Sequence, residues 1–393
     1  MAKCMILAVA GAGKTHHICQ NLERDKKNLV IAFTHENIKN LRYELRDAFG
    51  ECPELTDVMT FDSFVYRFAV RPYMPSIINH FPNAGFRPNG ITIKDPPPQR
   101  LMKKDKSGKG YYYPNPAYVK KDSLKHYVDE YNRLYCKTLC ELVMAVGSGK
   151  KALIKKIANG INRCYDSVSI DEFQDFREYE FDFVLGLAKE LNNVLLVGDF
   201  YQHSVAAMKN SGRPFQKGTT GITYDQFVEQ MKKSGFSIDI TSLIKSWRCS
   251  PSVCSFASTK LNIAIESHGQ SSGCVRIVAD DELDTVFADK DIVKLVNMNA
   301  AQQAFKPCRN WSYSKGDTYE KTCVILTEET SDILESDYKY SLKSPITRNK
   351  LYVALTRTKG DLLLVSKRQM DMWKRKHNKD KGDASYRKGN AND

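Results

Sequence analysis

A short run near the N-terminus combines the residue types that hold phosphate groups. Residues 7–17 read LAVAGAGKTHH, in which small residues lead into Lys14 and Thr15. A backbone without bulky side chains can wrap around an anion and point its N–H groups at it. In such a loop the lysine reaches the β and γ phosphates and the threonine binds Mg²⁺. The alternative is a glycine-rich turn that contains a lysine by chance, because Ala8 replaces the leading glycine of the strict motif.

Two acids follow an apolar run in the middle of the chain. In VSIDEFQDF, Asp171 and Glu172 come directly after a predicted buried strand. A phosphate loop needs a carboxylate that holds Mg²⁺ through water and a base that aligns the attacking water. Asp171 would hold the Mg²⁺ ion through water, and Glu172 would be the base that aligns the attacking water. A pair of exposed acids at a helix start is the alternative.

Further polar residues follow later apolar runs. Gln202 stands just beyond VLLVGD, at a strand end from which it can sense a γ-phosphate. In SWRCSP, Trp247 offers a ring for stacking on a base and Arg248 a guanidinium for phosphates. Arg357 follows the apolar helix predicted in LYVALTRTKG. Two arginines from a second lobe, aimed at a phosphate loop in the first, describe an interdomain ATPase with arginine fingers.

The elements that must position these residues alternate between strand and helix. Apolar runs predict strands at residues 5–9, 29–33, 57–60, 274–278, 291–296, 323–328 and 361–366. Helical periodicity lies between them, as at residues 36–49, where apolar residues fall on one face. This alternation predicts an α/β fold with two open, mostly parallel sheets.

The length of 393 residues allows two to three domains. We expect a first lobe at residues 1–64 and 163–237, an accessory insertion at 65–162, a second lobe at 238–373 and a basic flexible tail at 374–393. Within the insertion, residues 71–121 show no periodicity and predict loops. Its basic stretch from Lys94 to Lys125 includes Tyr111 to Tyr113, and can either grip a nucleic-acid strand or be a partly disordered loop.

Charge and hydropathy restrict the partners. The net charge of +13 favours a polyanionic partner without separating DNA, RNA and a membrane surface. No apolar run approaches the ~20 residues that span a bilayer. The apolar residues 5–10 lead into the phosphate loop instead of a cleavage site, so we expect no signal peptide, no membrane partner and a cytoplasmic location. The eleven cysteines form no C-x-x-C pair, which favours free thiols over a zinc site or a disulfide frame.

Taken in order, these motifs resemble those of a known family. The set AVAGAGKT, AFTHENIKNLRYEL, TFDSF, SIDEFQDF, LLVGDFYQ, SWRCSP, SYSKGDTYE and LYVALTRTK resembles the motif series of superfamily 1 DNA helicases of the UvrD/Rep type. The resemblance covers the chain from about residue 5 to residue 366. It implies two RecA-like parallel-sheet lobes with a mainly helical, loop-rich insertion in the first. The family often has alanine at the position of Ala8, so the glycine-rich run is interpreted as a phosphate loop.

The resemblance also implies a role for individual residues. ATP contacts are implied for Ala10, Gly11, Ala12, Gly13, Lys14, Thr15, His16, Trp247, Arg248 and Gly316. The implied catalytic set is Lys14, Glu172, Gln202, Arg248 and Arg357, and the implied Mg²⁺ ligands are Thr15 and Asp171. Contacts to single-stranded nucleic acid are implied for Thr34, Asn37, Thr60, Ser63 and Phe64, the last by stacking on bases.

The chain departs from the family in several places. Altered motif positions are Asp62, His203, Ser204, Val205, Ser312 and Thr318, and the usual upstream glutamine that reads adenine has no counterpart. Fewer than seventy residues separate Arg248 from Lys315. The large second-lobe insertion of full-length members cannot fit there, so we expect a compact member of the family.

Two functions from different classes remain open. The first is an ATP-driven helicase or translocase on single-stranded nucleic acid, expected to be DNA and to run 3′ to 5′. The second is a nucleotide-gated nucleic-acid sensor or adaptor in a larger complex, such as a phage-defence system, with little unwinding of its own. A protein partner that stimulates or uses the motor fits either function. A plain P-loop kinase leaves Gln202, Arg248 and Arg357 unexplained.

Overall fold

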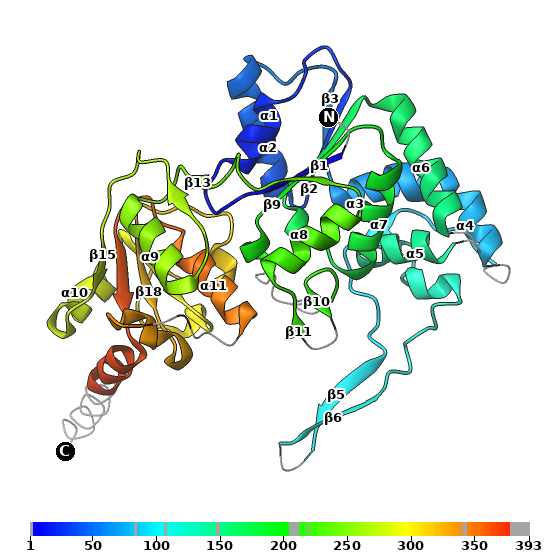
Figure 1. Cartoon of the computed structure of the whole chain (residues 1–393). Coiled ribbons are helices and arrows are strands. Elements are labelled where there is room, and N and C mark those ends of the chain that lie inside the picture. The colour runs from blue at the N-terminus through cyan, green and yellow to red at the C-terminus, as the bar shows by residue number, and fades with distance from the viewer. Residues whose placement is uncertain are drawn as a thin grey trace. The chain divides into compact units, whose positions relative to one another are not determined.

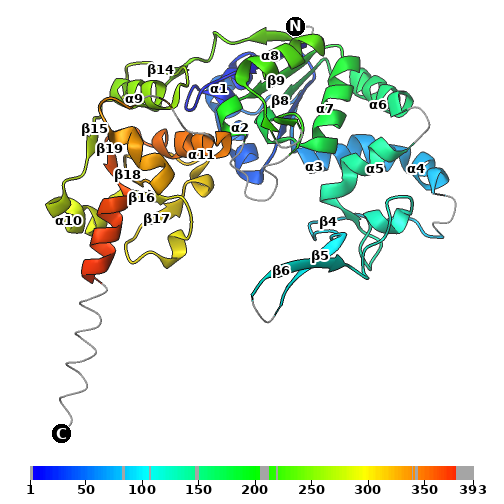
Figure 2. The ribbon, with the colours of Figure 1, turned by 60° about the horizontal axis from the view of Figure 1, so that its bottom comes forward.

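The computed structural model describes residues 3–81, 85–105, 108–146, 150–203, 212–217, 220–338, 340 and 344–377. The chain divides into two compact units. The first comprises Met1–Met5, Thr15–Val197 and Asp225–Ile238, and the second comprises Ile6–Lys14, Gly198–Tyr224 and Asp239–Asp393. Figures 1 and 2 show the ribbon from two directions. Two main sheets with parallel strand pairs confirm the predicted α/β fold.

The first sheet has six strands in the order β12-β1-β9-β8-β2-β3. They are β1 (Lys3–Leu7), β2 (Asn28–Ala32), β3 (Thr56–Thr60), β8 (Ser167–Ile170), β9 (Val194–Gly198) and β12 (Ser237–Asp239). The pairs β2–β3, β2–β8 and β8–β9 are parallel. Every residue of β2 and β9 is buried, as expected for parallel strands covered by helices on both faces.

Helices of the first unit cover both faces of this sheet. They are α1 (Lys14–Gln20), α2 (His35–Phe49), α3 (Phe61–Phe64), α5 (Leu139–Ala145), α6 (Lys150–Cys164), α7 (Glu178–Glu190) and α8 (Tyr224–Lys233). Figures 1 and 2 show α1 and α2 on one side of the sheet and α6 and α7 on the other. The bounds and the buried face of α2 agree with the signals in its sequence: Thr34 caps its start, Gly50 ends it with φ of 80°, and its apolar stripe is buried.

The insertion contains more structure than the sequence predicted. Residues 71–121 include α4 (Met74–His80), β4 (Ile91–Thr92), which pairs with β7 (Leu134–Tyr135), and a hairpin of β5 (Arg100–Lys104) and β6 (Gly110–Pro114). Figures 1 and 2 show this hairpin projecting from the rest of the insertion. The prediction of loops was therefore wrong here. Because nearly every residue of β5 and β6 is exposed, the hairpin lacks the apolar alternation that would have revealed it.

The second sheet has five parallel strands in the order β15-β19-β18-β16-β17. They are β15 (Val275–Ile277), β16 (Ile292–Val296), β17 (Cys308–Asn310), β18 (Lys321–Ile325) and β19 (Leu362–Val365). Four of them confirm predicted strands. The sequence missed β17, which has three residues and no apolar run.

Helices of the second unit are α9 (Pro251–Leu261), α10 (Leu283–Ala288), α11 (Pro345–Leu355) and a last helix over residues 367–377. Short pairs are β10 (Gln216–Lys217) with β11 (Thr220–Gly221), and β13 (Lys245–Ser246) with β14 (Glu266–Ser267). The predicted tail from residue 374 is corrected at its start, because residues 374–377 complete the last helix; residues 378–393 lie outside the described chain. No helix within the described ranges is long and apolar enough to cross a membrane.

Candidate nucleotide and nucleic-acid sites

The loop between β1 and α1 adopts a conformation that requires glycine. Gly11 and Gly13 have φ of 72° and 79°, in the left-handed region that side chains disfavour. A Cβ atom on Gly11 would lie 2.7 Å from the Cβ of Arg248 and 2.7 Å from the Oγ of Ser246. The side chains of Ser246 and Arg248 therefore pack against Gly11, within the second unit, so closely that a side chain at this position does not fit.

Hydrogen bonds within the second unit fix this loop. The Ala8 N–H donates to Gly198 O at 2.8 Å, and the Val9 N–H donates to Leu243 O at 2.9 Å. The Ala10 N–H donates to the buried Tyr352 hydroxyl at 2.8 Å. The Ala12 N–H donates to Val9 O at 3.3 Å. Helix α1 follows at Lys14, and the N–H groups in the first turn of a helix, which have no carbonyl acceptor within that helix, favour an anionic ligand.

The predicted metal ligands meet in the first unit. The Thr15 hydroxyl donates to Asp171 Oδ2 at 2.9 Å. Asp171 follows β8 directly and is completely buried. A hydroxyl and a carboxylate are hard oxygen donors, so this pair fits Mg²⁺. Among the described residues, no group of three or more His, Cys, Asp or Glu side chains could hold a metal by itself.

Glu172 is held in a strained conformation beside the metal pair. Its φ is 56° and its ψ 39°, a left-handed geometry that is uncommon for residues other than glycine. Its N–H donates to Asp171 Oδ1 at 2.8 Å, and its carboxylate accepts from the amide of Gln174. Backbone strain of this kind costs ~1–3 kcal/mol and clusters at functional sites. The sequence did not single out Gln174.

Gln202 is positioned by a buried acid of the second unit. Its Nε2 donates to Asp199 Oδ2 at 2.8 Å, and Gln202 and Asp199 are 3% and 0% exposed. The same carboxylate accepts from the Tyr201 N–H at 2.9 Å. Asp199 therefore fixes the amide that we expect to sense a γ-phosphate. The neighbours Ser204 and Val205, where the motif departs from the family, lie outside the described residues.

Arg357 is a buried cation in the second unit. It is 1% exposed; its Nε donates to Val353 O at 2.9 Å and one Nη to Asp317 O at 3.4 Å. No carboxylate forms an ion pair with it in the part of the chain that the structure describes. Burial, reinforced by the charge of Arg248, lowers the pKa of Arg357 to about 9. The site is thus electrostatically incomplete without an anion.

Arg248, Tyr352 and Trp247 lie around the loop within the same unit. Arg248 donates to Thr356 O at 3.3 Å, and the Trp247 N–H donates to Gly11 O at 2.9 Å. The Trp247 ring is 49% exposed and stacks on His268, with ring centres 3.4 Å apart. The tryptophan is therefore partly accessible, and its stacking on a base stays a prediction. Sequence reasoning missed Tyr352, whose signal is a single hydroxyl within an otherwise apolar helix run.

Two other implied nucleotide contacts lie in different surroundings. His16 Nδ1 lies 2.9 Å from a carboxylate oxygen of Glu44, so this ring is engaged with α2. Gly316 has φ of 90°, and a Cβ there would meet no atom within 4 Å, so open space surrounds it. Its neighbour Asp317 accepts from Arg357, which connects this segment to the buried cation.

The predicted nucleic-acid residues separate into helix caps and core. Thr34 and Thr60 cap α2 and α3 by accepting from the N–H groups of Asn37 and Ser63. Phe64 is instead completely buried and contacts Phe68 and other core rings. Its predicted stacking on bases is therefore corrected: the apolar helix face that carries Phe64 packs into the core.

The structure reveals a basic groove beside these caps in the first unit. A pocket of about 350 Å³ is lined by Thr60 and Ser63 together with arginines, and it shares Tyr66 and Arg71 with a second pocket of about 320 Å³. The arginines of this basic groove are Arg42, Arg67, Arg71 and Arg87. A π-helix over Val65–Val70 presents part of this lining, and such irregular turns are frequent at functional sites. The only signal in the sequence was the four-residue spacing of two of these arginines.

The hairpin offers a second cationic and aromatic surface. Tyr111 and Tyr113 project from one face of β6, with ring centres 6.4 Å apart, and Lys103 pairs across from Tyr111. Tyr112 is 67% exposed on the opposite face. Exposed rings beside cations are typical of surfaces that stack bases and hold phosphates.

Comparison with protein families matches residues 122–366, more than half of the chain, to the viral superfamily 1 RNA helicase core domain. The chain belongs to this family, which confirms the resemblance at the level of the superfamily. The matched range includes Asp171, Gln202, Arg248 and Arg357 but not the phosphate loop. No curated protein sequence matches.

Three solved structures are similar to the chain. Arterivirus nonstructural protein 10 (helicase) in complex with DNA has 12% identity and a TM-score of 0.42 over 92% of this chain and 60% of that one. A crystal structure of Arterivirus nonstructural protein 10 (helicase) has 13% identity and a TM-score of 0.41 over 92% of this chain and 59% of that one. The structure of the PRRSV helicase has 12% identity and a TM-score of 0.39 over 92% of this chain and 52% of that one. The chain thus spans between about half and three fifths of the length of these structures.

Proposed function

We propose that the chain is a nucleotide-driven motor on single-stranded nucleic acid, with ATP and Mg²⁺ as its cofactors. The observation that carries this proposal is the buried Arg357, which lacks a carboxylate partner in the described chain and shares a unit with the phosphate-loop residues 6–14. A buried guanidinium of this kind is stabilised by an anion, and the γ-phosphate of ATP supplies one. Arg248 provides a second cation for the same group.

The remaining residues divide the chemistry of hydrolysis. Lys14 and the amides at the start of α1 hold the β and γ phosphates, and Thr15 with Asp171 holds Mg²⁺, which neutralises phosphate charge. Glu172 accepts a proton from the attacking water. The water oxygen forms the new bond to the γ-phosphorus while the bond to ADP breaks and ADP leaves. Trp247 stacks on the base, and Gln202 senses the γ-phosphate.

The basic groove is the proposed track for the strand. Its arginines bind successive phosphates, while Thr60 and Ser63 lie along the same pocket. The exposed tyrosines of the hairpin add stacking surfaces, each worth ~1–3 kcal/mol per base. We propose DNA and movement from 3′ to 5′, as the UvrD/Rep-like motif series implies. The description of the matched family favours RNA as the second candidate strand.

One experiment tests the function and the strand together. ATP hydrolysis by the purified chain is measured alone and with single-stranded DNA, single-stranded RNA or duplex, with Lys14→Ala as the control without a phosphate contact. We expect magnesium-dependent turnover that single-stranded DNA stimulates, and displacement of a blocking protein from one strand end. Stimulation by single-stranded RNA but not by single-stranded DNA would identify RNA as the strand on which the motor acts. Stimulation without displacement would favour the sensor, and hydrolysis that persists in Lys14→Ala would contradict the proposed site.

A further inference from the structure

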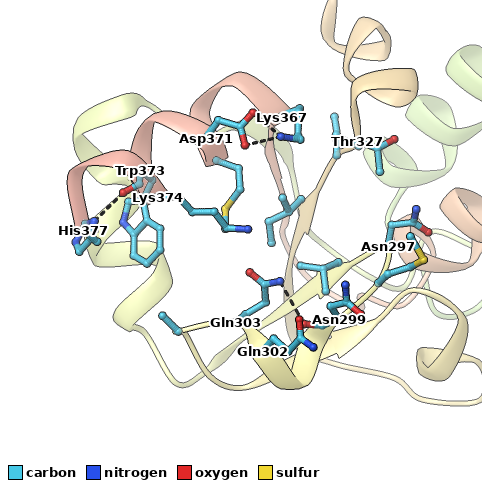
Figure 3. Close-up of a pocket in the computed structure, with 16 residues that line it drawn as sticks. Asn297, Asn299, Gln302, Gln303, Thr327, Lys367, Asp371, Trp373, Lys374 and His377 are labelled. Atoms are coloured by element: carbon cyan, nitrogen blue, oxygen red, sulfur yellow. Dashed lines mark hydrogen bonds and ion pairs between the residues drawn. The ribbon is translucent and has the colours of Figure 1, made fainter. Parts of the chain in front are cut away.

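The second unit contains a pocket whose lining includes none of the residues given a role in the proposed function. Its volume is about 820 Å³, and it lies where β16 and β18 end, under the helix over residues 367–377. We call it the switch-point pocket and define it by the lining residues Asn297, Met298, Gln302, Met370, Trp373 and Lys374. Figure 3 shows the labelled amides on one wall and the last helix on the opposite wall.

The topology of the second sheet explains why a pocket forms here. In the order β15-β19-β18-β16-β17, the chain leaves β16 toward β17 on one side and leaves β18 toward β19 on the other. The loops after β16 and β18 therefore diverge and open a crevice at their carboxyl ends. In open α/β sheets this is the usual position of a bound ligand. The volume also falls within the ~300–1,000 Å³ of small-molecule sites.

One wall of the pocket is a fixed aromatic and sulfur-containing surface. The Trp373 indole N–H donates to Asp284 Oδ1 at 2.7 Å, and its ring meets Phe287 edge to face at 4.9 Å. Met370 is buried beside it, 4% exposed, while Met298 on the β16 loop is 64% exposed. Thioethers and indoles pack well against flat heteroaromatic rings.

The polar lining is largely uncommitted. Within the described chain, the side-chain amides of Asn297 and Gln302 have no hydrogen-bond partner, and Lys374 forms no ion pair. The carboxylate of Asp371 is already paired with Lys367. The pocket therefore offers two amides, each able to donate and to accept, and one cation that no acid neutralises.

We propose that the switch-point pocket binds a nucleotide, with its base against Met370 and Trp373 and its phosphate on Lys374. Each amide can pair with a base edge that carries a donor beside an acceptor. A cationic ligand would meet Lys374 without a free carboxylate, and a purely apolar ligand would leave both amides unpaired. The nucleotide can be free in solution or part of a strand, and the chemistry of recognition is the same.

The test uses the full chain with Lys14→Ala as background, which removes the contribution of the phosphate loop. Binding of AMP, GMP, CMP and UMP is measured by calorimetry, and 8-azido-AMP and an azido-labelled oligonucleotide are photocrosslinked and mapped by mass spectrometry. Asn297→Ala and Lys374→Ala are compared with Arg375→Ala, a neighbouring exposed cation outside the lining. We expect each pocket variant to weaken binding about tenfold, the scale of one lost hydrogen bond to a charged or polar partner, and the control to change it less than twofold.

Each outcome decides the proposal. Crosslinks of 8-azido-AMP within residues 297–303 or 367–377 support a free nucleotide, and crosslinks of the oligonucleotide alone support a base of the strand. Crosslinks to neither segment, or equal affinity in Asn297→Ala, Lys374→Ala and Arg375→Ala, overturn it. Because the background already lacks Lys14, a failure of the motor proposal leaves these readouts unchanged.

Discussion

Arg357→Met separates the energetic penalty of a buried charge from its catalytic use. Methionine keeps much of the side-chain length and volume but removes the guanidinium. Burial lowers the pKa of Arg357 to about 9 from the usual arginine range, which at 1.36 kcal/mol for each pH unit corresponds to a penalty on the order of 5 kcal/mol near neutral pH. Replacement of buried ionic residues by apolar ones stabilises proteins by ~1–4 kcal/mol. We therefore expect Arg357→Met to melt several degrees above the parent when no nucleotide is present.

The sign of the pH dependence follows from the same pKa. A cationic group with a lowered pKa in the folded state destabilises the fold at every pH below about 9. As the pH rises above about 9, the folded parent releases this proton before the unfolded chain does, so the penalty declines. The difference in melting temperature between variant and parent should be constant from pH 6 to pH 8 and should narrow at pH 10.

The activity should move in the opposite direction. An arginine that stabilises phosphoryl transfer contributes ~10³–10⁵ in kcat, so phosphate release at saturating ATP and Mg²⁺ should fall at least ~10³-fold. Arg348→Met is the matched control: Arg348 lies on α11, the helix that ends just before Arg357, and its guanidinium stacks over Tyr201 at 5.1 Å. That variant should lose stability and keep turnover within a few fold. If Arg357→Met is as destabilised as the control and still hydrolyses ATP, the buried cation has a structural role and the reasoning is refuted.

Three further predictions test other parts of the proposal. Gly11→Ala should weaken binding of a fluorescent ATP analogue at least ~10-fold and lower the melting temperature, because a non-glycine residue in the left-handed conformation costs ~1–3 kcal/mol and the new Cβ would clash with the side chains of Ser246 and Arg248; parent-like binding would contradict the close approach. Glu172→Gln should bind ATP normally while its turnover falls by ~10²-fold, and normal turnover would exclude it as the base. Arg67→Ala with Arg71→Ala should reduce the slope of log affinity for single-stranded DNA against log salt by about 0.7 for each residue, measured by anisotropy titration; an unchanged slope would remove the groove from the strand's path.

The sequence predicted the parts of the site that depend on local chemistry. The spacing of glycine, lysine and threonine indicated the phosphate loop, and the acids after β8 indicated the metal pair; both depend on residues adjacent in sequence. Strands also followed from apolar runs, because a buried parallel strand needs apolar residues on both faces. The roles of these residues in catalysis stay predictions until the variants above are measured.

Features that depend on distant contacts were not visible in the sequence. Phe64 stands at a motif position, but only the packing around α3 decides that its ring faces the core. The hydroxyl of Tyr352 and the carboxylate of Asp199 act on residues far away in the chain, so no periodic pattern marks them. The hairpin was missed for a related reason: exposed strands have no apolar face to reveal them.

Each unit keeps one group in a state that its own fold does not favour. Glu172 holds a left-handed backbone in the first unit, and Arg357 in the second holds a buried charge without an acidic ion-pair partner among the described residues. Folded proteins depart from local rules mainly where function requires it, since elsewhere such departures only lower stability. A ligand that relieves the buried charge binds the folded state alone, and therefore stabilises it by about 2.7 kcal/mol at a hundred times its dissociation constant. On this argument, ATP with Mg²⁺ should raise the melting temperature of the parent more than that of Arg357→Met, because only the parent has a penalty for the phosphate to remove.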